Sequence, residues 1–308
     1  MSLYKLKKGD IIGIVSPSGS ITKEIMIQFN EGVKFLKEQG FNIKYGKNIF
    51  KVDDYSAGTP EEKADDINEM FADKEVKAII CSQGGDNANS VLPLLDYELI
   101  KNNPKVFMGI SDITVLLLGI YKKTGMITFH GNDIMWGFGW NPSKYDEDEF
   151  KKIIVEGQIG KIIKNGERKT VREGITEGSL VGGNIKCLMK LAGTDYFPEM
   201  KDSILFLEEH TTTPEECDYQ FNQLKQMGVF EKIKGVVIGY IYGLQAENEN
   251  LIQMEEVLLN VTKEYTFPIL KINDFGHCCP NTTLPIGAKV RLDATNCDIE
   301  IMEHYFDM

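Results

Sequence analysis

The sequence lacks the short motifs that mark the common nucleotide and metal sites of enzymes. It has no G-x-x-x-x-G-K-[ST] phosphate loop, no G-x-G-x-x-G at its first predicted helix, no H-E-x-x-H and no C-x-x-C. Its 4 histidines are far apart in the chain, and their spacing favours no metal site. The motifs therefore support neither a dinucleotide nor a metal.

Excess positive charge, long apolar runs and paired cysteine spacing are also absent. The chain has 34 Lys and Arg against 46 Asp and Glu, a net charge of −12, which argues against the basic surface of a nucleic-acid scaffold. Its longest uncharged apolar stretch, residues 113–121, is far shorter than the ~20 residues of a membrane helix. The run at 11–15 is too short for a signal peptide. The 6 cysteines lack a framework spacing, so we expect a cytoplasmic protein that binds neither nucleic acid nor membrane.

The composition is that of a globular protein, with 42% hydrophobic and 26% charged residues. At roughly 150 residues per domain, the length predicts about two domains. In the first half, short apolar runs alternate with amphipathic segments such as 22–39, whose apolar residues recur every three or four positions. The runs, which predict strands, are 11–15, 41–45, 78–81, 106–110 and 127–130. This alternation predicts βαβ units, a parallel sheet and hence an α/β fold.

The pattern changes after about residue 136. Residues 136–142 are punctuated by Gly and Pro and predict a loop or domain junction. Beyond them helices are fewer and β-like runs are more widely separated, at 153–155, 180–181, 204–207, 236–240 and 290–292. We expect an N-terminal α/β domain over 1–150, a C-terminal β-rich mixed domain over 170–308, and a linker or active-site loop over 136–170.

A serine stands where one predicted strand gives way to a helix. The strand of 106–110 ends at Ser111, and an apolar helix begins at once. Open α/β sheets bind ligands at this edge, and the N–H groups of a helix start stabilise a developing oxyanion. Ser111 is thus a candidate nucleophile. The alternative makes Ser111 a helix cap and Asp112 a first-turn acid, and the second Gly of a G-x-S-x-G elbow is missing.

Two further pairs of residues follow predicted strands. Gly84 and Gly85 permit the close backbone approach of an anion-holding loop, or else form a plain turn. Glu208 and Glu209 end an apolar run. Because neighbouring strand residues point to opposite faces, we expect at most one of these acids to serve a given site. The alternative is a pair of solvated charges.

His277 lies in a loop rich in Gly and Pro. A loop histidine with a pKa of about 6.5 is a candidate general base, and a packed core histidine is the alternative. Ser111, Glu208 and His277 thus follow one another along the chain, each at a strand end or in a loop. A nucleophile, a base and a carboxylate that orients the base are the parts of a catalytic triad.

Several separate motifs occur together in the order typical of one enzyme family. Over nearly its whole length the chain resembles the LD-carboxypeptidase family of serine peptidases. The segments that carry the resemblance are SPS (16–18), QGG (83–85), GISDIT (109–114), TFHG (128–131), GSLVGGN (178–184), LAGT (191–194), LFLE (205–208), FGH (275–277) and LPIG (284–287). The resemblance implies an N-terminal α/β sandwich with a mainly parallel sheet, a C-terminal β-rich mixed domain, and an active site between them.

The resemblance also implies roles for individual residues. Ser111 would be the nucleophile, His277 the general base and Glu208 the acid that orients His277. The backbone N–H groups of Asp112 and of the Gly84–Gly85 segment would form the oxyanion hole. Family members commonly dimerise and need no metal, so we expect a homodimer without a cofactor. Their usual substrate is the L,D-bond before the terminal D-alanine of muropeptides recycled from the cell wall.

The glycine loop departs from the pattern of the wall-recycling members. These often have RGGYG where this chain has QGGDN at 83–87. That version is more similar to the microcin-immunity branch, whose members cleave an amide that joins a peptide or amino acid to a nucleotide-like group. Asn87, Trp136 and Trp140 are then candidate substrate contacts, the indoles by stacking on a base. Packing between domains is the alternative for the tryptophans, and a non-catalytic small-molecule binding protein is the alternative for the whole chain.

Overall fold

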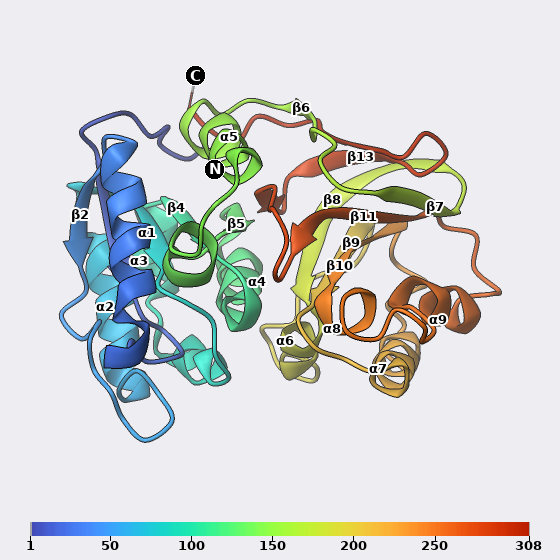
Figure 1. The fold of residues 1–308 in the computed structure, drawn as a ribbon, viewed down its shortest axis with the longest axis horizontal. Helices are drawn as coiled ribbons and strands as arrows, with labels where there is room; N and C mark the ends of the chain where they lie inside the picture. Colours follow the sequence, from blue (N-terminus) through green and yellow to red (C-terminus); the bar gives the residue numbers. More distant parts are fainter. Residues whose placement is uncertain (1, 308) are drawn as a thin grey trace.

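Two β-sheets form the frame of the computed structural model, which describes residues 2–307 (Figure 1). The first sheet has 6 strands in the order β12-β5-β4-β3-β1-β2. They are β1 (Ile11–Val15), β2 (Asn42–Tyr45), β3 (Val76–Cys81), β4 (Val106–Gly109), β5 (Thr128–His130) and β12 (Leu284–Ile286). β1 to β5 pair in parallel, and β12 joins them antiparallel. The parallel α/β sheet predicted from the first half of the chain is confirmed.

Helices α1 to α5 come from the same half of the chain as strands β1 to β5 of the first sheet. They are α1 (Met26–Glu38), α2 (Pro60–Ala72), α3 (Tyr97–Asn102), α4 (Thr114–Thr124) and α5 (Lys144–Phe150). The central strands β3 and β4 are buried on both faces, as in a parallel sheet covered on both sides. α1 buries Phe29, Val33 and Leu36, the face that its apolar spacing predicts. No helix within residues 2–307 is both long and apolar enough to cross a membrane.

The structure corrects two predictions for the middle of the chain. The sequence predicts a loop or domain junction over 136–142, yet Ile134–Phe138 form a π-helical turn, and only residues 139–142 of that stretch lie outside helices and strands. Asp133 stabilises this turn because its carboxylate accepts hydrogen bonds from two backbone N–H groups inside it. The β-like run at 153–155 is also helical, within a π-helical turn at Lys151–Val155. An apolar run this short does not distinguish a strand from a buried helix segment.

The second sheet is mixed and has 8 strands in the order β6-β14-β13-β8-β9-β10-β11-β7. They are β6 (Gly160–Lys161), β7 (Arg168–Arg172), β8 (Ile175–Asn184), β9 (Ser203–Glu209), β10 (Gly235–Ile241), β11 (Ile269–Gly276), β13 (Lys289–Asp293) and β14 (Asp298–Ile301). Helices α6 (Ile185–Lys190), α7 (Pro214–Gln226), α8 (Tyr242–Gln245) and α9 (Met254–Val261) lie between its central strands in the chain. Strands β8 to β11 are parallel, and the flanking pairs are antiparallel. The β-rich mixed character predicted for this half is confirmed.

The chain crosses back from the second sheet to the first after β11. β12 lies in the first sheet, where Leu284 pairs with His130 and Ile286 with Thr128. His277 directly follows β11 and is therefore the first residue of the crossing segment. In Figure 1, α4 lies between the two sheets, where it contacts α6 and β8. The junction of the two halves thus brings together the start of α4, the ends of β8 and β9, and the segment that begins with His277.

Candidate active site

Ser111 lies at a strained turn between β4 and α4. Its φ angle is +61°, in the left-handed region that costs a non-glycine residue about 1–2 kcal/mol. Ser111 begins a short 3-10 turn in which Ile110 occupies the cap position. The interpretation of Ser111 as a helix cap is therefore wrong. A strained serine between a strand and a helix is instead typical of a nucleophile held clear of its sheet.

The glycine loop packs directly against this serine. A Cβ atom on Gly84 would lie 2.6 Å from Ser111 Cβ, 2.8 Å from its Oγ and 3.3 Å from the backbone N of Asp112. The carbonyl of Gly84 accepts a hydrogen bond from the N–H of Gly19 at 2.9 Å, which fixes the loop. Gly85 has a φ angle of +149°, a conformation that glycine adopts without steric cost. The loop backbone therefore lies beside the serine hydroxyl, as an anion-holding loop requires.

Replacing Gly84 with Ala is expected to impair the reaction more than the fold. The backbone of Gly84 is outside the positive-φ region, so its dihedral angles suit alanine, but the methyl group would collide with Ser111. We expect kcat to fall about 10²–10³-fold, the size of losing one oxyanion donor, and Tm to fall by the amount that an overpacking cost of about 1–3 kcal/mol produces. Steady-state kinetics and thermal unfolding measure both. Wild-type kcat in this variant would show that the space beside Ser111 is not used in the reaction.

Asp112 joins three segments of the chain through one fully buried carboxylate. It accepts hydrogen bonds from Ser18 Oγ at 2.6 Å and from the N–H of Ala88 at 2.8 Å. It also pairs with Lys190 Nζ at 2.6 Å. Because Lys190 lies on α6, this ion pair fastens the turn of Ser111 to the second half of the molecule. No sequence pattern points to Lys190, because a lysine in the last turn of a helix is common.

Removing the charge of Lys190 is expected to destabilise the fold. Lys190→Met keeps most of the aliphatic stem but leaves the buried Asp112 carboxylate without its cation. Because the Lys190 side chain is 26% exposed, we expect a loss of about 1–3 kcal/mol, below the range for a fully buried pair. Urea unfolding measures it. Lys34→Met is the control, because its pair with Glu31 is exposed and should contribute less than about 0.5 kcal/mol. Equal small losses would contradict the prediction.

A buried carboxylate holds one nitrogen of His277. Glu208 is fully buried near the end of β9, and its Oε2 lies 2.5 Å from His277 Nδ1. Burial alone would lower the pKa of His277, but Glu208, with smaller contributions from Glu209 and Asp133, raises this pKa above its ordinary value. Burial would likewise raise the pKa of Glu208, yet His277 and His130 hold it well below its usual range. The contact leaves His277 Nε2 for a second partner, as in a general base oriented by an acid.

Glu209 is also buried, but its carboxylate binds groups other than His277. Its carboxylate accepts hydrogen bonds from Asn184 Nδ2 at 3.0 Å and from the N–H of His210 at 2.9 Å. It therefore fastens the turn between β8 and α6 to β9. The alternation along the strand explains why Glu208 faces His277 and Glu209 does not. The interpretation of the two acids as solvated charges is wrong, because Glu208 is 0% and Glu209 4% exposed.

Ser111 and the Glu208–His277 pair come from different sheets that meet at the junction of the two halves. Asn184 pairs with Glu208 where β8 and β9 end, and its N–H donates to Thr114 Oγ1 at 3.2 Å. Thr114 follows Ser111 by three residues and begins α4. Within residues 2–307, no hydrogen bond joins Ser111 to His277. Contacts between nucleophile and base often tighten only in the complex with substrate.

The two tryptophans lie beside the glycine loop. Trp136 Nε1 donates to Gln83 Oε1 at 2.9 Å, and Gln83 directly precedes Gly84. The rings of Trp136 and Trp140 lie 5.6 Å apart at 47°. They are 47% and 56% exposed, respectively, so neither ring is packed away between domains. An exposed pair of indoles beside the glycine loop is available to a ligand.

Asn87 makes its hydrogen bonds inside the protein. Its Oδ1 accepts from Lys63 Nζ at 2.8 Å, and its Nδ2 donates to the carbonyl of Tyr55 at 3.1 Å. These contacts fix the loop that follows β3, so the amide already has partners in the absence of a ligand. Within residues 2–307, no group of three or more His, Cys, Asp or Glu side chains is arranged to hold a metal ion.

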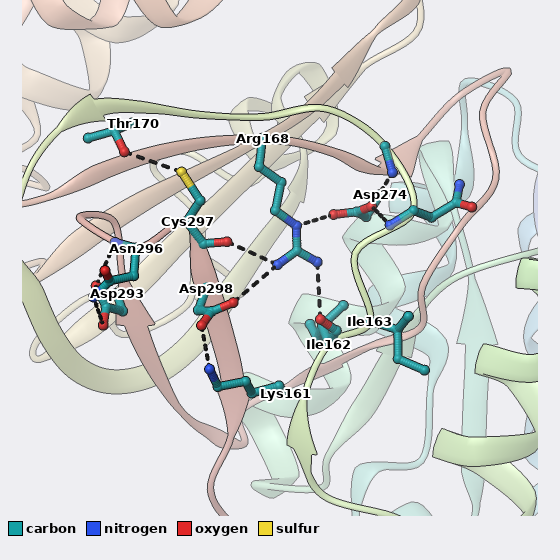
Figure 2. A network of polar contacts seen from close by, with 12 residues as sticks. Lys161, Ile162, Ile163, Arg168, Thr170, Asp274, Asp293, Asn296, Cys297 and Asp298 are labelled. Atoms are coloured by element: carbon teal, nitrogen blue, oxygen red, sulfur yellow. Dashed lines mark hydrogen bonds and ion pairs between the residues drawn. The ribbon is translucent and has the colours of Figure 1, made fainter.

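A buried ion pair anchors β11 just before His277 (Figure 2). Arg168 Nε donates to Asp274 Oδ2 at 2.6 Å, and both side chains are at most 1% exposed. The other oxygen of Asp274 accepts hydrogen bonds from the N–H groups of Asn165 and Gly166, each at 2.7 Å. Because Asp274 precedes His277 by three residues, this network fixes the strand from which the histidine loop departs. No local sequence pattern indicates this pair, because Arg168 and Asp274 are more than 100 residues apart.

Two family profiles match the chain. The profile of the LD-carboxypeptidase N-terminal domain matches residues 12–131, and that of the LD-carboxypeptidase C-terminal domain matches residues 177–292. The chain belongs to the LD-carboxypeptidase family. The first profile covers the turn of Ser111, and the second covers Glu208 and His277. The resemblance inferred from the separate motifs is confirmed, and membership places the chain among peptidase-type hydrolases.

Curated and solved relatives align with almost the whole chain. The microcin C7 self-immunity protein MccF of Escherichia coli is 34% identical over 97% of this chain and 95% of its own. A probable murein peptide carboxypeptidase of Bacillus subtilis is 30% identical over 94% of this chain and 90% of the carboxypeptidase. The structure of MccF in complex with aspartyl sulfamoyl adenosine has a TM-score of 0.94 at 32% identity over 100% of both chains. An MccF-like protein from Bacillus anthracis has a TM-score of 0.90 at 32% identity over 99% of this chain and 100% of its own.

Proposed function

We propose that this protein is a serine peptidase that hydrolyses an amide bond by acyl transfer. Ser111 is the nucleophile, His277 the general base, and Glu208 the acid that orients His277. The contact of 2.5 Å between the buried Glu208 carboxylate and His277 Nδ1 carries the proposal. The strained turn of Ser111 beside Gly84 supports it.

The proposed mechanism uses the Ser111 hydroxyl, the Nε2 atom of His277 and the N–H groups of the neighbouring backbone. Ser111 Oγ attacks the scissile carbonyl carbon while His277 Nε2 accepts the hydroxyl proton. The oxyanion accepts hydrogen bonds from the N–H of Asp112 and from the Gly84–Gly85 backbone. When the C–N bond breaks, His277 returns the proton to the leaving amine. A water molecule then attacks the acyl-enzyme by the same steps, which releases the carboxylic acid and restores Ser111.

We infer a small peptide substrate of the LD-carboxypeptidase type, namely a cell-wall muropeptide or a related peptide. The family to which the chain belongs supports this substrate class. A second candidate is a peptide or amino acid joined through an amide to a nucleotide. It is favoured by the half-exposed rings of Trp136 and Trp140 beside the glycine loop, which offer a surface for stacking a base. MccF, which aligns over the whole chain, has been solved with aspartyl sulfamoyl adenosine.

One assay panel separates the two substrate classes. Purified protein is incubated with a muropeptide tetrapeptide and, separately, with an aminoacyl sulfamoyl adenosine, and the released D-alanine or amino acid is quantified. Preferential release of D-alanine supports the muropeptide class, and preferential cleavage of the nucleotide conjugate supports the second. A matched comparison with Trp136→Ala tests the stacking surface, because only the nucleotide conjugate should show a raised KM. An unchanged KM would remove the indole from the substrate site.

A non-catalytic binding protein is the competing explanation from another class. A fluorophosphonate reacts covalently only with an activated serine, so labelling of Ser111, located by peptide mass spectrometry, excludes that explanation. We also expect a homodimer in solution, as family members commonly form, and light scattering measures the mass directly. A monomeric mass would contradict this expectation without bearing on the triad.

A further inference from the structure

His130 occupies a position between the two halves of the proposed triad. It is the last residue of β5, where it pairs with Gly109 of β4 on one side and with Leu284 of β12 on the other. Gly109 precedes Ser111 by two residues, and Leu284 ends the crossing that begins with His277. The strand of His130 therefore lies between the strand that delivers the nucleophile and the strand that follows the base.

The imidazole of His130 is enclosed by the strands that carry the acid and the base. Its ring packs edge-on against Phe206 and Phe275, at centroid distances of 5.4 and 6.2 Å. Phe206 precedes Glu208 by two residues on β9, and Phe275 precedes His277 by two. Because side chains two apart on a strand share a face, the His130 ring lies on the face to which Glu208 points.

Three polar atoms meet in this enclosure without a hydrogen-bond partner among residues 2–307. They are both ring nitrogens of His130 and Oε1 of Glu208, and both side chains are completely buried. His130 Nε2 lies 3.7 Å from Glu208 Oε1, while the other oxygen, Oε2, binds His277. A buried carboxylate oxygen without a partner is costly. A proton on His130 Nε2 gives this oxygen a donor, whereas the other tautomer would place a lone pair against the carboxylate.

We propose that His130 is a positioning residue that donates from Nε2–H to Glu208 Oε1 and so holds the carboxylate in line with His277. This inference rests on the proposed triad. The proposed hydrogen bond requires the Nε2–Oε1 separation to shorten from the 3.7 Å of the structure. With both oxygens engaged, the carboxylate does not rotate when positive charge develops on His277. The motif TFHG thus supplies a second, buried histidine that acts through the acid.

Two variants separate this role from simple packing. His130→Phe keeps the aromatic volume but removes both nitrogens, and His130→Gln keeps an N–H donor near the position of Nε2. We expect the second-order rate of fluorophosphonate labelling at Ser111 to fall about tenfold or more in His130→Phe, the effect of losing a hydrogen bond to a charged group. His130→Gln should stay within about threefold of wild type. Tm is also expected to fall in His130→Phe, because the buried Glu208 Oε1 then has no donor; a purely packing role predicts instead that His130→Phe labels normally and His130→Gln does not.

The control is Thr128→Val on the same strand. Thr128 is equally buried, but its hydroxyl donates to the carbonyl of Leu117 at 3.0 Å, so its loss should lower Tm and leave the labelling rate unchanged. Proton NMR follows the bond between His277 and Glu208 directly, and its downfield resonance should move in both His130 variants but not in Thr128→Val. A wild-type labelling rate in His130→Phe, or an unmoved resonance, overturns the inference about His130 but not the proposed triad. Absence of labelling in the wild type overturns the proposed function, and this inference with it.

Discussion

Replacing Ser111 with Ala is expected to lower kcat by about four to six orders of magnitude, as in other triads that lose the nucleophile. Binding should persist, because the glycine loop and the exposed tryptophans do not depend on the hydroxyl. Alanine keeps the side-chain Cβ and the strained backbone with its φ angle of +61°, so stability should change little. The measurement is turnover of whichever amide the substrate panel identifies, together with KM and Tm of the variant.

Ser203→Ala is the matched control for this loss. Ser203 begins β9, at the opposite end of the strand from Glu208, and its hydroxyl donates to the carbonyl of Met200 at 2.8 Å. The control should lose some stability and keep its kcat within about twofold, since hydroxyl removal there costs one buried hydrogen bond. Near-full amidase activity in Ser111→Ala, with unchanged KM, would show that another residue is the nucleophile.

The structural features that the sequence predicts are those determined by residues close together in the chain. The α1 helix is one example, because the apolar spacing within 22–39 predicts the face that it buries. The buried parallel strands are another, since continuous apolar runs separated by amphipathic segments leave few other arrangements. Ser111, Glu208 and His277 are candidates because each stands at a strand end or in a loop, where ligands of an α/β fold bind, and their separate roles are what the family resemblance implies.

The features that the sequence did not show depend on partners far away in the chain. Lys190 resembles any helix-terminal lysine until the fold places the buried Asp112 beside it. Arg168 and Asp274 are unremarkable in isolation and form a completely buried pair in the structure. His130 carries no signal beyond its place in a motif, because its role depends on Glu208 arriving from the other sheet. The π-helical turn at 134–138 is not visible in the sequence because Gly and Pro near it are typical of a loop, and the one at 151–155 because a short apolar run has no distinctive period.

The arrangement explains why both halves are needed for one site. Glu208 and His277 come from the second sheet, yet the segment after His277 ends as β12 in the sheet that delivers Ser111. A shift of one sheet against the other therefore moves the base loop as well as the nucleophile. The Asp112–Lys190 pair and the hydrogen bond between Asn184 and Thr114 resist such a shift.

Replacing Glu208 with Gln is expected to be nearly as damaging to turnover as loss of the serine. Glutamine keeps the shape but favours the wrong tautomer of His277, and in a comparable triad this lowers kcat by about 10⁴-fold. The pH profile gives a second signature, because His277 must be neutral to act as a base and kcat/KM therefore rises through its pKa. In the wild type, burial lowers the pKa of His277, and the Glu208 carboxylate is the strongest influence that raises it. Without this carboxylate the pKa of His277 falls, so the acid limb of kcat/KM moves to lower pH.

Glu209→Gln is the control that decides which acid orients the base. The carboxylate of Glu209 accepts hydrogen bonds at the turn between β8 and α6, and a glutamine oxygen retains part of that function. We expect kcat within a few-fold of wild type, with a smaller shift of the acid limb in the same direction, since Glu209 contributes less than Glu208 to raising the pKa of His277. Equal losses in the two variants would mean that both carboxylates act on the histidine. The alternation of side chains along β9 would then be an insufficient account of their roles.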